Sequence, residues 1–189
     1  MTAGSAAARA VPAEDEAARR QAELDESLTR FIQENHKLIE RFLRRLCADR
    51  ALVEDALQEA LITTCAKWEI VSQHDQPLFW VRKTAWHKLM ALQESGRGTV
   101  RLDDVLPEAL VEPTNPWEAQ LMVQYLLRRL PARQAAVLAL AADGNTDEEI
   151  CLQLDLALTT VRSYKAAARR KLKELAEQAE YAAATRRRS

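Results

Sequence analysis

Apolar residues recur every three to four positions along most of this chain, which is the period of a helix and not of a strand. Three such runs occupy residues 28–46, 51–68 and 77–93. The third run begins at Pro77, and proline is favoured at the first position of a helix. The alternating pattern of half-buried strands is almost absent, so the sequence predicts an all-α protein.

The stretches between these runs divide the chain. Residues 1–26 are small or charged and have no apolar period, which predicts a disordered N-terminal extension. Residues 94–118 hold Gly96, Gly98 and three prolines, and are rich in acidic residues, which is typical of a flexible linker. We therefore expect one helical domain at 27–93, a second at 119–176, and a frayed basic tail at 177–189.

The second domain carries the pattern of a helix-turn-helix. Thr146 and Glu149 have the spacing of a capping box, in which each side chain satisfies a backbone donor at a helix start. Ile150 and Leu154 lie four apart and can pack inward from this short helix. The helix that follows has an apolar line at Val161, Tyr164, Ala168 and Leu172, and a second, mostly basic line at Arg162, Ala166, Arg169 and Lys173. Insertion into the DNA major groove requires a helix with an apolar back and a basic front, and a short scaffold helix that supports it.

Charge supports this interpretation. Residues 157–189 contain nine Lys and Arg against three Asp and Glu, although the whole chain has a net charge of only −1. Such a basic segment is suited to a polyanion. A plain helical hairpin with a solvated cationic face is the alternative. Ala157 stands where a capping side chain is expected, and Thr159 is a candidate cap two residues later.

Composition excludes several classes of protein. No apolar run is long enough to span a membrane, and the N-terminus has no signal-peptide core, so we expect a cytoplasmic protein. Cys47, Cys65 and Cys151 have no metal-ligand or disulfide spacing, and we interpret them as buried small apolar residues. The sequence has no nucleophile elbow or phosphate-binding loop, so we expect neither an enzyme nor a cofactor.

Two further surfaces are candidates for binding. Trp80, Lys83 and His87 are spaced by three and four on the third helix, and rings interleaved with cations suit single-stranded nucleic acid. Tryptophan at helical spacing can equally belong to the core; we expect Trp80 to be partly buried and Trp86 to be exposed. The second helix has an acidic strip at Glu54, Asp55, Gln58 and Glu59, which by itself is typical of a solvated face.

Three motifs in this order resemble the bacterial RNA polymerase sigma factors of the extracytoplasmic-function group. Asp55-Ala56-Leu57-Gln58-Glu59 resembles part of conserved region two, and the segment from Phe79 to His87 resembles its promoter-melting helix. Leu130-Pro131-Ala132-Arg133-Gln134 with Thr160-Val161-Arg162-Ser163 resembles conserved region four. The resemblance covers residues 28–175. It implies a region 2 helical bundle and a region 4 helix-turn-helix, joined by the acidic linker.

The resemblance also implies roles for residues. Residues expected to dock on core RNA polymerase are Asp55, Gln58 and Glu59, with Leu57 and Leu61 behind them. Residues expected at the minus-ten promoter element are Trp80, Lys83, Trp86, His87 and Lys88. Residues expected at the minus-thirty-five element are Thr159, Thr160, Arg162, Ser163, Lys165, Ala166, Arg169 and Arg170. One departure is Asp155 in place of the usual turn glycine, which remains feasible because Asp tolerates the left-handed conformation.

The function that follows is promoter-specific initiation of transcription, with the polymerase performing the catalysis. The expected partners are core RNA polymerase and promoter DNA, with an anti-sigma factor as a further candidate and no insertion into a membrane. The alternative is a stand-alone helix-turn-helix regulator that dimerises through its N-terminal helices.

Overall fold

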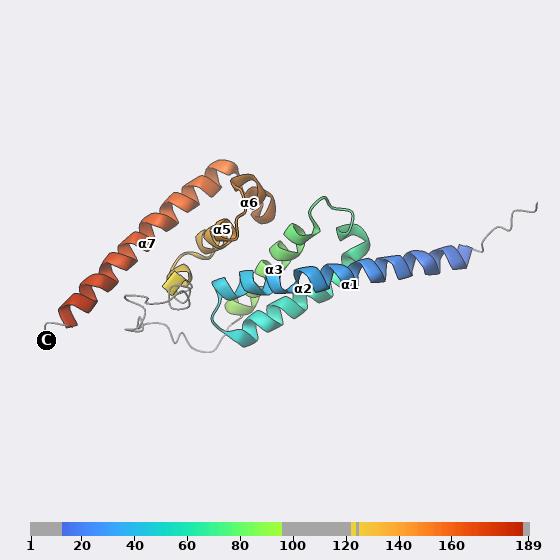
Figure 1. The fold of residues 1–189 in the computed structure, drawn as a ribbon, viewed down its shortest axis with the longest axis horizontal. Coiled ribbons are helices and arrows are strands. Elements are labelled where there is room, and N and C mark those ends of the chain that lie inside the picture. Colours follow the sequence, from blue (N-terminus) through green and yellow to red (C-terminus); the bar gives the residue numbers. More distant parts are fainter. Residues whose placement is uncertain (1–12, 96–121, 124, 187–189) are drawn as a thin grey trace, which may run out of the picture.

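The computed structural model describes residues 13–95, 122–123 and 125–186. These residues form helices and turns, with no strand among them, which confirms the all-α prediction. The helices are α1 (Ala13–Leu46), α2 (Arg50–Val71), α3 (Pro77–Glu94), α5 (Ala132–Ala142), α6 (Asp147–Leu154) and α7 (Leu158–Arg186) (Figure 1). Within this part of the chain, no helix is both long and apolar enough to cross a bilayer.

The first domain is a bundle of α1, α2 and α3. Its core includes Phe42 from α1, Val53 from α2 and Leu89 from α3, all of which are buried. The turn between α1 and α2 is fixed by Asp49, whose carboxylate accepts hydrogen bonds from the backbone N–H groups of Ala51 and Leu52. This cap satisfies backbone donors that the helix itself leaves unpaired. The bundle thus fixes the positions of the outer faces of α2 and α3 relative to each other.

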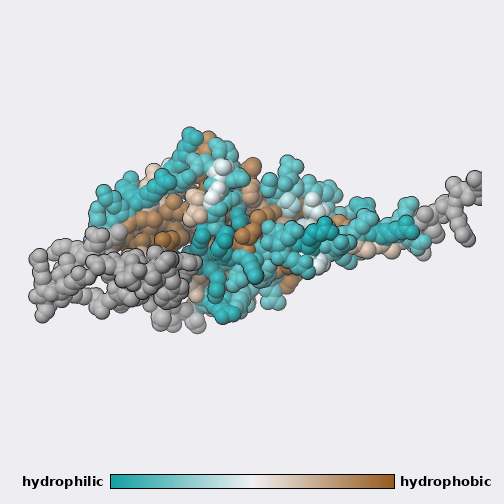
Figure 2. Space-filling model, viewed as in Figure 1, coloured by the Kyte–Doolittle hydropathy of each residue, from teal (hydrophilic) through white to brown (hydrophobic). Residues whose placement is uncertain are grey.

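The N-terminal extension corrects the prediction of disorder over residues 1–26. Residues 13–26 form the first turns of α1, while residues 1–12 lie outside the described residues. This part of α1 projects beyond the bundle (Figure 1), and its visible face is mostly hydrophilic (Figure 2). Its alanines, glutamates and arginines have high helix propensity. They extend a helix that Leu28 and Phe31 already anchor on the core, so no new nucleation is needed.

The second domain contains α5, α6 and α7, which pack on one another. Its core includes Leu140 from α5, Ile150 from α6 and Val161 from α7. Residue Asp155 ends α6 with a φ of 55°, so the predicted left-handed turn is confirmed. Helix α7 continues to Arg186, so residues 177–186 are not the frayed tail that the sequence predicted. The linker expected at 94–118 lies outside the described residues from residue 96 onward.

The predicted capping box is present at the start of α6. The Thr146 hydroxyl accepts from the backbone N–H of Glu149 at 3.2 Å, and the Glu149 carboxylate accepts from the backbone N–H of Thr146 at 2.7 Å. Helix α7, by contrast, begins at Leu158, and the carbonyl of Ala157 accepts the first helical bond, from Val161. The prediction that Thr159 caps α7 is therefore wrong, because Thr159 already lies inside the helix.

Replacing Thr146 by Ala should lower the free energy of unfolding by about 1 kcal/mol, the usual contribution of such a cap. Thr159→Ala is the matched control and should change stability much less, since Thr159 does not cap α7. Urea unfolding followed by circular dichroism measures both. Equal losses in the two variants would contradict the assignment of the cap.

Candidate nucleic-acid and polymerase interfaces

Helix α7 presents an exposed polar and basic front on a buried apolar back. Val161 and Ala168 are fully buried against the second domain, with Tyr164 and Leu172 partly buried beside them. Most of the predicted minus-thirty-five residues lie outward: Thr159, Arg162, Ser163, Ala166, Arg169 and Arg170 are exposed, while Thr160 and Lys165 are half-buried. This front is the surface that a major groove could accept.

Asp147 of α6 connects the scaffold helix to α7. Its carboxylate accepts a hydrogen bond from Lys165 at 2.6 Å and lies 3.6 Å from the Arg162 guanidinium. The hydrogen bond from Lys165 and the nearby charge of Arg162 lower the pKa of Asp147. Lys165 is therefore held within the domain, and Arg162 keeps most of its side chain exposed. The sequence did not reveal this restraint, because the two helices bring together residues 18 positions apart.

The outer face of α3 gathers most of the predicted minus-ten residues. His87 is exposed, and Trp80, Lys83 and Lys88 are half-buried. Trp86 is only 5% exposed, so the prediction of an exposed Trp86 is wrong. It follows Ala85 on the inward side of α3, and its indole packs into the core. The centroids of the Trp86 and His87 rings lie 4.9 Å apart, with the two rings tilted relative to each other.

The histidine on this face lies among cations. Burial lowers the pKa of His87, and the charges of Lys83 and Arg133 lower it further. Both cations disfavour the imidazolium form, so His87 is neutral at neutral pH. It can therefore contribute a flat ring and a neutral hydrogen-bonding group at this surface, but no charge.

An NMR titration of the His87 imidazole should give a midpoint below the ordinary value of 6.5. Arg133→Ala should move that midpoint upward, because one of the opposing charges is removed. A His87 midpoint that does not respond to Arg133→Ala would contradict this description of its surroundings.

The predicted polymerase face lies on the outer side of α2. Asp55 and Gln58 are exposed, and Leu57 is buried behind them. Glu59 lies 3.3 Å from the ammonium of Lys88 on α3, so the polymerase face and the minus-ten face adjoin. Farther along α2, Ile62 and Ile70 are 61% and 68% exposed, and the sequence reasoning missed both. The signal that could have revealed them is their spacing. Ile62 and Ile70 lie eight residues apart, on a face of the helix that differs from the face of Val53 and Leu57.

The cysteines correct another prediction. Cys47 is buried as expected, but Cys65 is exposed and Cys151 only half-buried. Cys65 lies on the outer face of α2, which is not the face that packs on α1 and α3. Across the part of the chain that the structure describes, no group of His, Cys, Asp and Glu could hold a metal ion.

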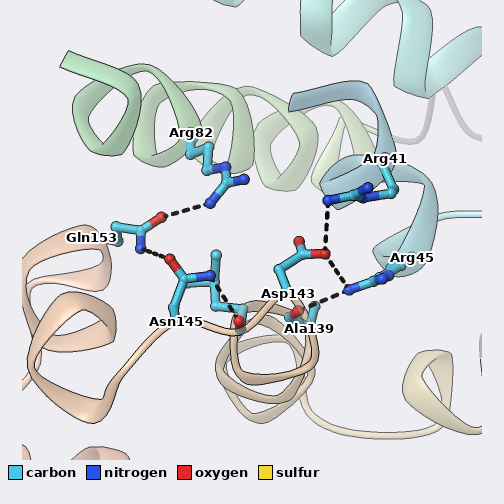
Figure 3. Close-up of polar contacts among 8 residues, drawn as sticks. Arg41, Arg45, Arg82, Ala139, Asp143, Asn145 and Gln153 are labelled. Atoms are coloured by element: carbon cyan, nitrogen blue, oxygen red, sulfur yellow. Dashed lines mark hydrogen bonds and ion pairs between the residues drawn. The ribbon is translucent and has the colours of Figure 1, made fainter. Parts of the chain in front are cut away.

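The two domains meet through a polar cluster that the sequence did not predict. Helix α1 contacts α5, and α3 contacts α6. Figure 3 shows Arg41 and Arg45 directed at Asp143, and Arg82 directed at Gln153. Arg82, Gln153 and the Asp143 side chain are 5%, 1% and 2% exposed. The sequence gives no sign of these pairs, because the two partners of each pair lie on different domains.

Comparisons with known proteins agree with this architecture. The family model for sigma-70 region 2 matches residues 31–93. The family model GerE, described as bacterial regulatory proteins of the luxR family, matches residues 128–180. No curated protein matches the chain.

One similar solved structure is the sigma factor RpoE in complex with the anti-sigma factor NepR from Bartonella quintana. The TM-score is 0.63 at 18% sequence identity, over 80% of this chain and 98% of that one. At this identity the similarity shows a shared fold.

A region 2 bundle followed by a helix-turn-helix of the luxR type defines a two-domain promoter-recognition protein. Residues 31–93 match the sigma-70 region 2 family, and together with the helix-turn-helix that follows they support a transcription initiation sigma factor. Proteins of this family are in general not enzymes.

Proposed function

We propose that three surfaces act in transcription initiation, each with a different partner: the acidic face of α2, the outer face of α3 and the exposed front of α7. Asp55, Gln58 and Glu59 dock on the clamp helices of the largest subunit of core RNA polymerase. Trp80, Lys83 and His87 meet the minus-ten element as its strands separate, and the exposed front of α7 enters the major groove at the minus-thirty-five element. The protein acts in the cytoplasm and leaves all catalysis to the polymerase.

The observation that best supports this proposal is the form of α7. Its apolar back is buried, its exposed front carries Arg162, Ser163 and Arg169, and a capped scaffold helix supports it. Arginine in the major groove contacts guanine edges or the adjacent phosphates. The same chain carries an acidic face on α2, which is unsuited to DNA and suited to a protein partner.

Arg162→Ala should reduce initiation at a cognate promoter, with a loss of about 1–3 kcal/mol of discrimination against the wrong base. Run-off transcript yield from matched and mutated promoters measures this loss. Lys171→Ala removes an exposed cation of α7 that is not on the line of Arg162 and Arg169, and it should leave the ratio of the two yields nearly unchanged. An unchanged ratio for Arg162→Ala would remove this residue from the groove.

A stand-alone regulator is the second candidate, and the match of residues 128–180 to luxR-family regulators favours it. Such a protein would dimerise and bind palindromic duplex tightly without polymerase. A gel shift with the purified protein alone separates the two candidates. We expect weak binding, because the acidic face of α2 opposes DNA and each chain carries only one recognition helix.

An anti-sigma factor is a further proposed partner. The structurally similar RpoE was solved in complex with one. The exposed Ile62 and Ile70 of α2 support a protein partner on that side of the first domain, since exposed apolar side chains at interfaces gain from burial.

A further inference from the structure

Asp147, the first residue of α6, pairs with two cations of α7 at once. Its Oδ1 atom accepts a hydrogen bond from the Lys165 ammonium at 2.6 Å, and its Oδ2 atom lies 3.6 Å from Nε of Arg162. Thr146 and Glu149 form the capping box of α6, so the cap does not depend on the Asp147 side chain. Each oxygen of this carboxylate therefore serves one cation of the helix that carries the basic front.

The two cations differ in how far they extend into solvent. The side chain of Lys165 is 20% exposed and that of Arg162 is 64% exposed. A hydrogen bond between a carboxylate and an ammonium group is among the stronger polar contacts of a protein, and partial burial strengthens it further. Lys165 is therefore held against the second domain, and Arg162 is the cation that projects from it.

Arg162 meets the carboxylate through one edge of its guanidinium group. The group has five N–H donors in one plane, of which Nε carries one and the two terminal nitrogens carry four. In the part of the chain that the structure describes, Arg162 forms no second ion pair. The terminal nitrogens thus remain for another acceptor, and guanine offers two acceptors, O6 and N7, to such a pair of donors in the major groove.

The same carboxylate reduces the number of cations that α7 offers to phosphates. Phosphate contacts are independent of sequence, and each added cation strengthens binding to any duplex. Lys165 already has a partner within the domain, whereas Arg169 is exposed and has no ion-pair partner among the described residues. Specificity is the difference between the affinities for the correct and the wrong sequence. A residue that orients a base contact and weakens phosphate contacts therefore raises specificity.

We propose that Asp147 is a specificity-determining residue of the helix-turn-helix, which orients the Arg162 guanidinium for a guanine edge and keeps Lys165 from the DNA phosphates. Asp147 acts through these two cations, so it is a positioning residue. The inference deepens the proposed function and rests on it for the entry of α7 into the major groove. It gives Lys165 a supporting role in place of the DNA contact that the sequence predicted.

The first measurement uses the full chain and a duplex without promoter sequence, over a range of salt concentrations. Asp147→Asn releases Lys165, so binding should tighten, and the plot of log affinity against log salt should become steeper by about one unit of slope. Glu148→Gln is the matched control. Glu148 is exposed in the same turn of α6 and pairs with no α7 cation in the described region, so the slope should stay that of the wild type.

Two further variants test the supporting role of Lys165 in the same assay. Arg169→Ala removes an exposed cation and should make the slope shallower by about one unit. Lys165→Ala removes a cation that is already paired, so it should change the slope much less. Equal changes for the two variants would show that Lys165 contacts phosphates and would overturn the inference. Circular dichroism confirms that each variant retains its helices.

The second measurement uses holoenzyme assembled from core polymerase and the full chain. Promoter fragments that the wild type transcribes are randomised at the upstream element, and the transcribed sequences are counted. The wild type should prefer guanine at one position, and Arg162→Ala should lose that preference. Asp147→Asn should reduce it about fivefold, within the range for one bidentate contact. The double variant should equal Arg162→Ala alone, because Asp147 affects this base only through Arg162.

Failure of the proposed function and failure of this inference give different results. Wild-type holoenzyme that prefers no base at the upstream element would count against the proposed function, and against the inference that rests on it. A wild type that prefers guanine while Asp147→Asn prefers it equally would overturn the inference alone. A loss of transcription by Asp147→Asn that is the same for every sequence would show a merely structural role, and would also overturn it. A slope for Asp147→Asn that matches that of Glu148→Gln would do the same.

Discussion

Glu59→Arg should abolish co-purification of the protein with core RNA polymerase while its helical fold is retained. Glu59 lies on the acidic face of α2, partly exposed, and its carboxylate pairs with Lys88 at 3.3 Å. Reversing a charge in a charged interface places like charges together, which costs several kcal/mol. That cost corresponds to a loss of affinity on the order of a hundredfold or more.

The pairing with Lys88 makes a second variant necessary. Arg at position 59 also repels Lys88, so the change affects α3 as well as the docking face. Asp55→Arg reverses an exposed charge one turn earlier and should weaken polymerase binding without that side effect. Glu34→Arg, on the exposed side of α1, is the matched control and should bind as the wild type does. Unchanged co-purification of both α2 variants would refute the docking assignment.

Trp86→Ala should lower the free energy of unfolding by about 3–5 kcal/mol, the range for removing a large aromatic side chain from a core. Trp86 is 5% exposed, so its loss leaves a cavity between α3 and the rest of the first domain. The indole N–H has no hydrogen-bond partner among the described side chains and backbone groups, so the loss is one of packing. Equilibrium unfolding in urea measures it.

Trp80→Ala is the comparison for this prediction. Trp80 is half-buried and only partly packed on the core, so its removal should cost less stability. It should instead weaken binding to single-stranded DNA by about 1–3 kcal/mol if a base stacks on its ring. A stable Trp86→Ala variant with reduced DNA binding would reverse the roles assigned to the two tryptophans.

The elements predicted from the sequence are those with a strong local signal. The third helix was predicted from Pro77 to Gln93 and observed from Pro77 to Glu94. The capping box at Thr146 and the left-handed turn at Asp155 both depend on residues within a few positions of each other. Helical period and turn chemistry are local properties, so a single sequence contains them.

The remaining features depend on packing between distant segments. Residues 13–26 looked disordered by composition but extend α1, because the folded bundle supplies the start of that helix. Trp86 was predicted to be exposed and Cys65 to be buried, and both predictions are wrong. A residue at the edge of the apolar face of a helix can be either buried or exposed, and the sequence does not distinguish the two. The pairing of Arg45 with Asp143 joins two domains across 98 positions, and nothing in the local pattern indicates it.

Run-off transcription with core RNA polymerase, this protein and a pool of genomic promoter fragments tests directly whether the protein is an initiation factor. We expect transcripts from a defined subset of fragments that share two sequence elements, and none without the protein. Polymerase that neither associates with the chain nor gains any new start site would contradict it.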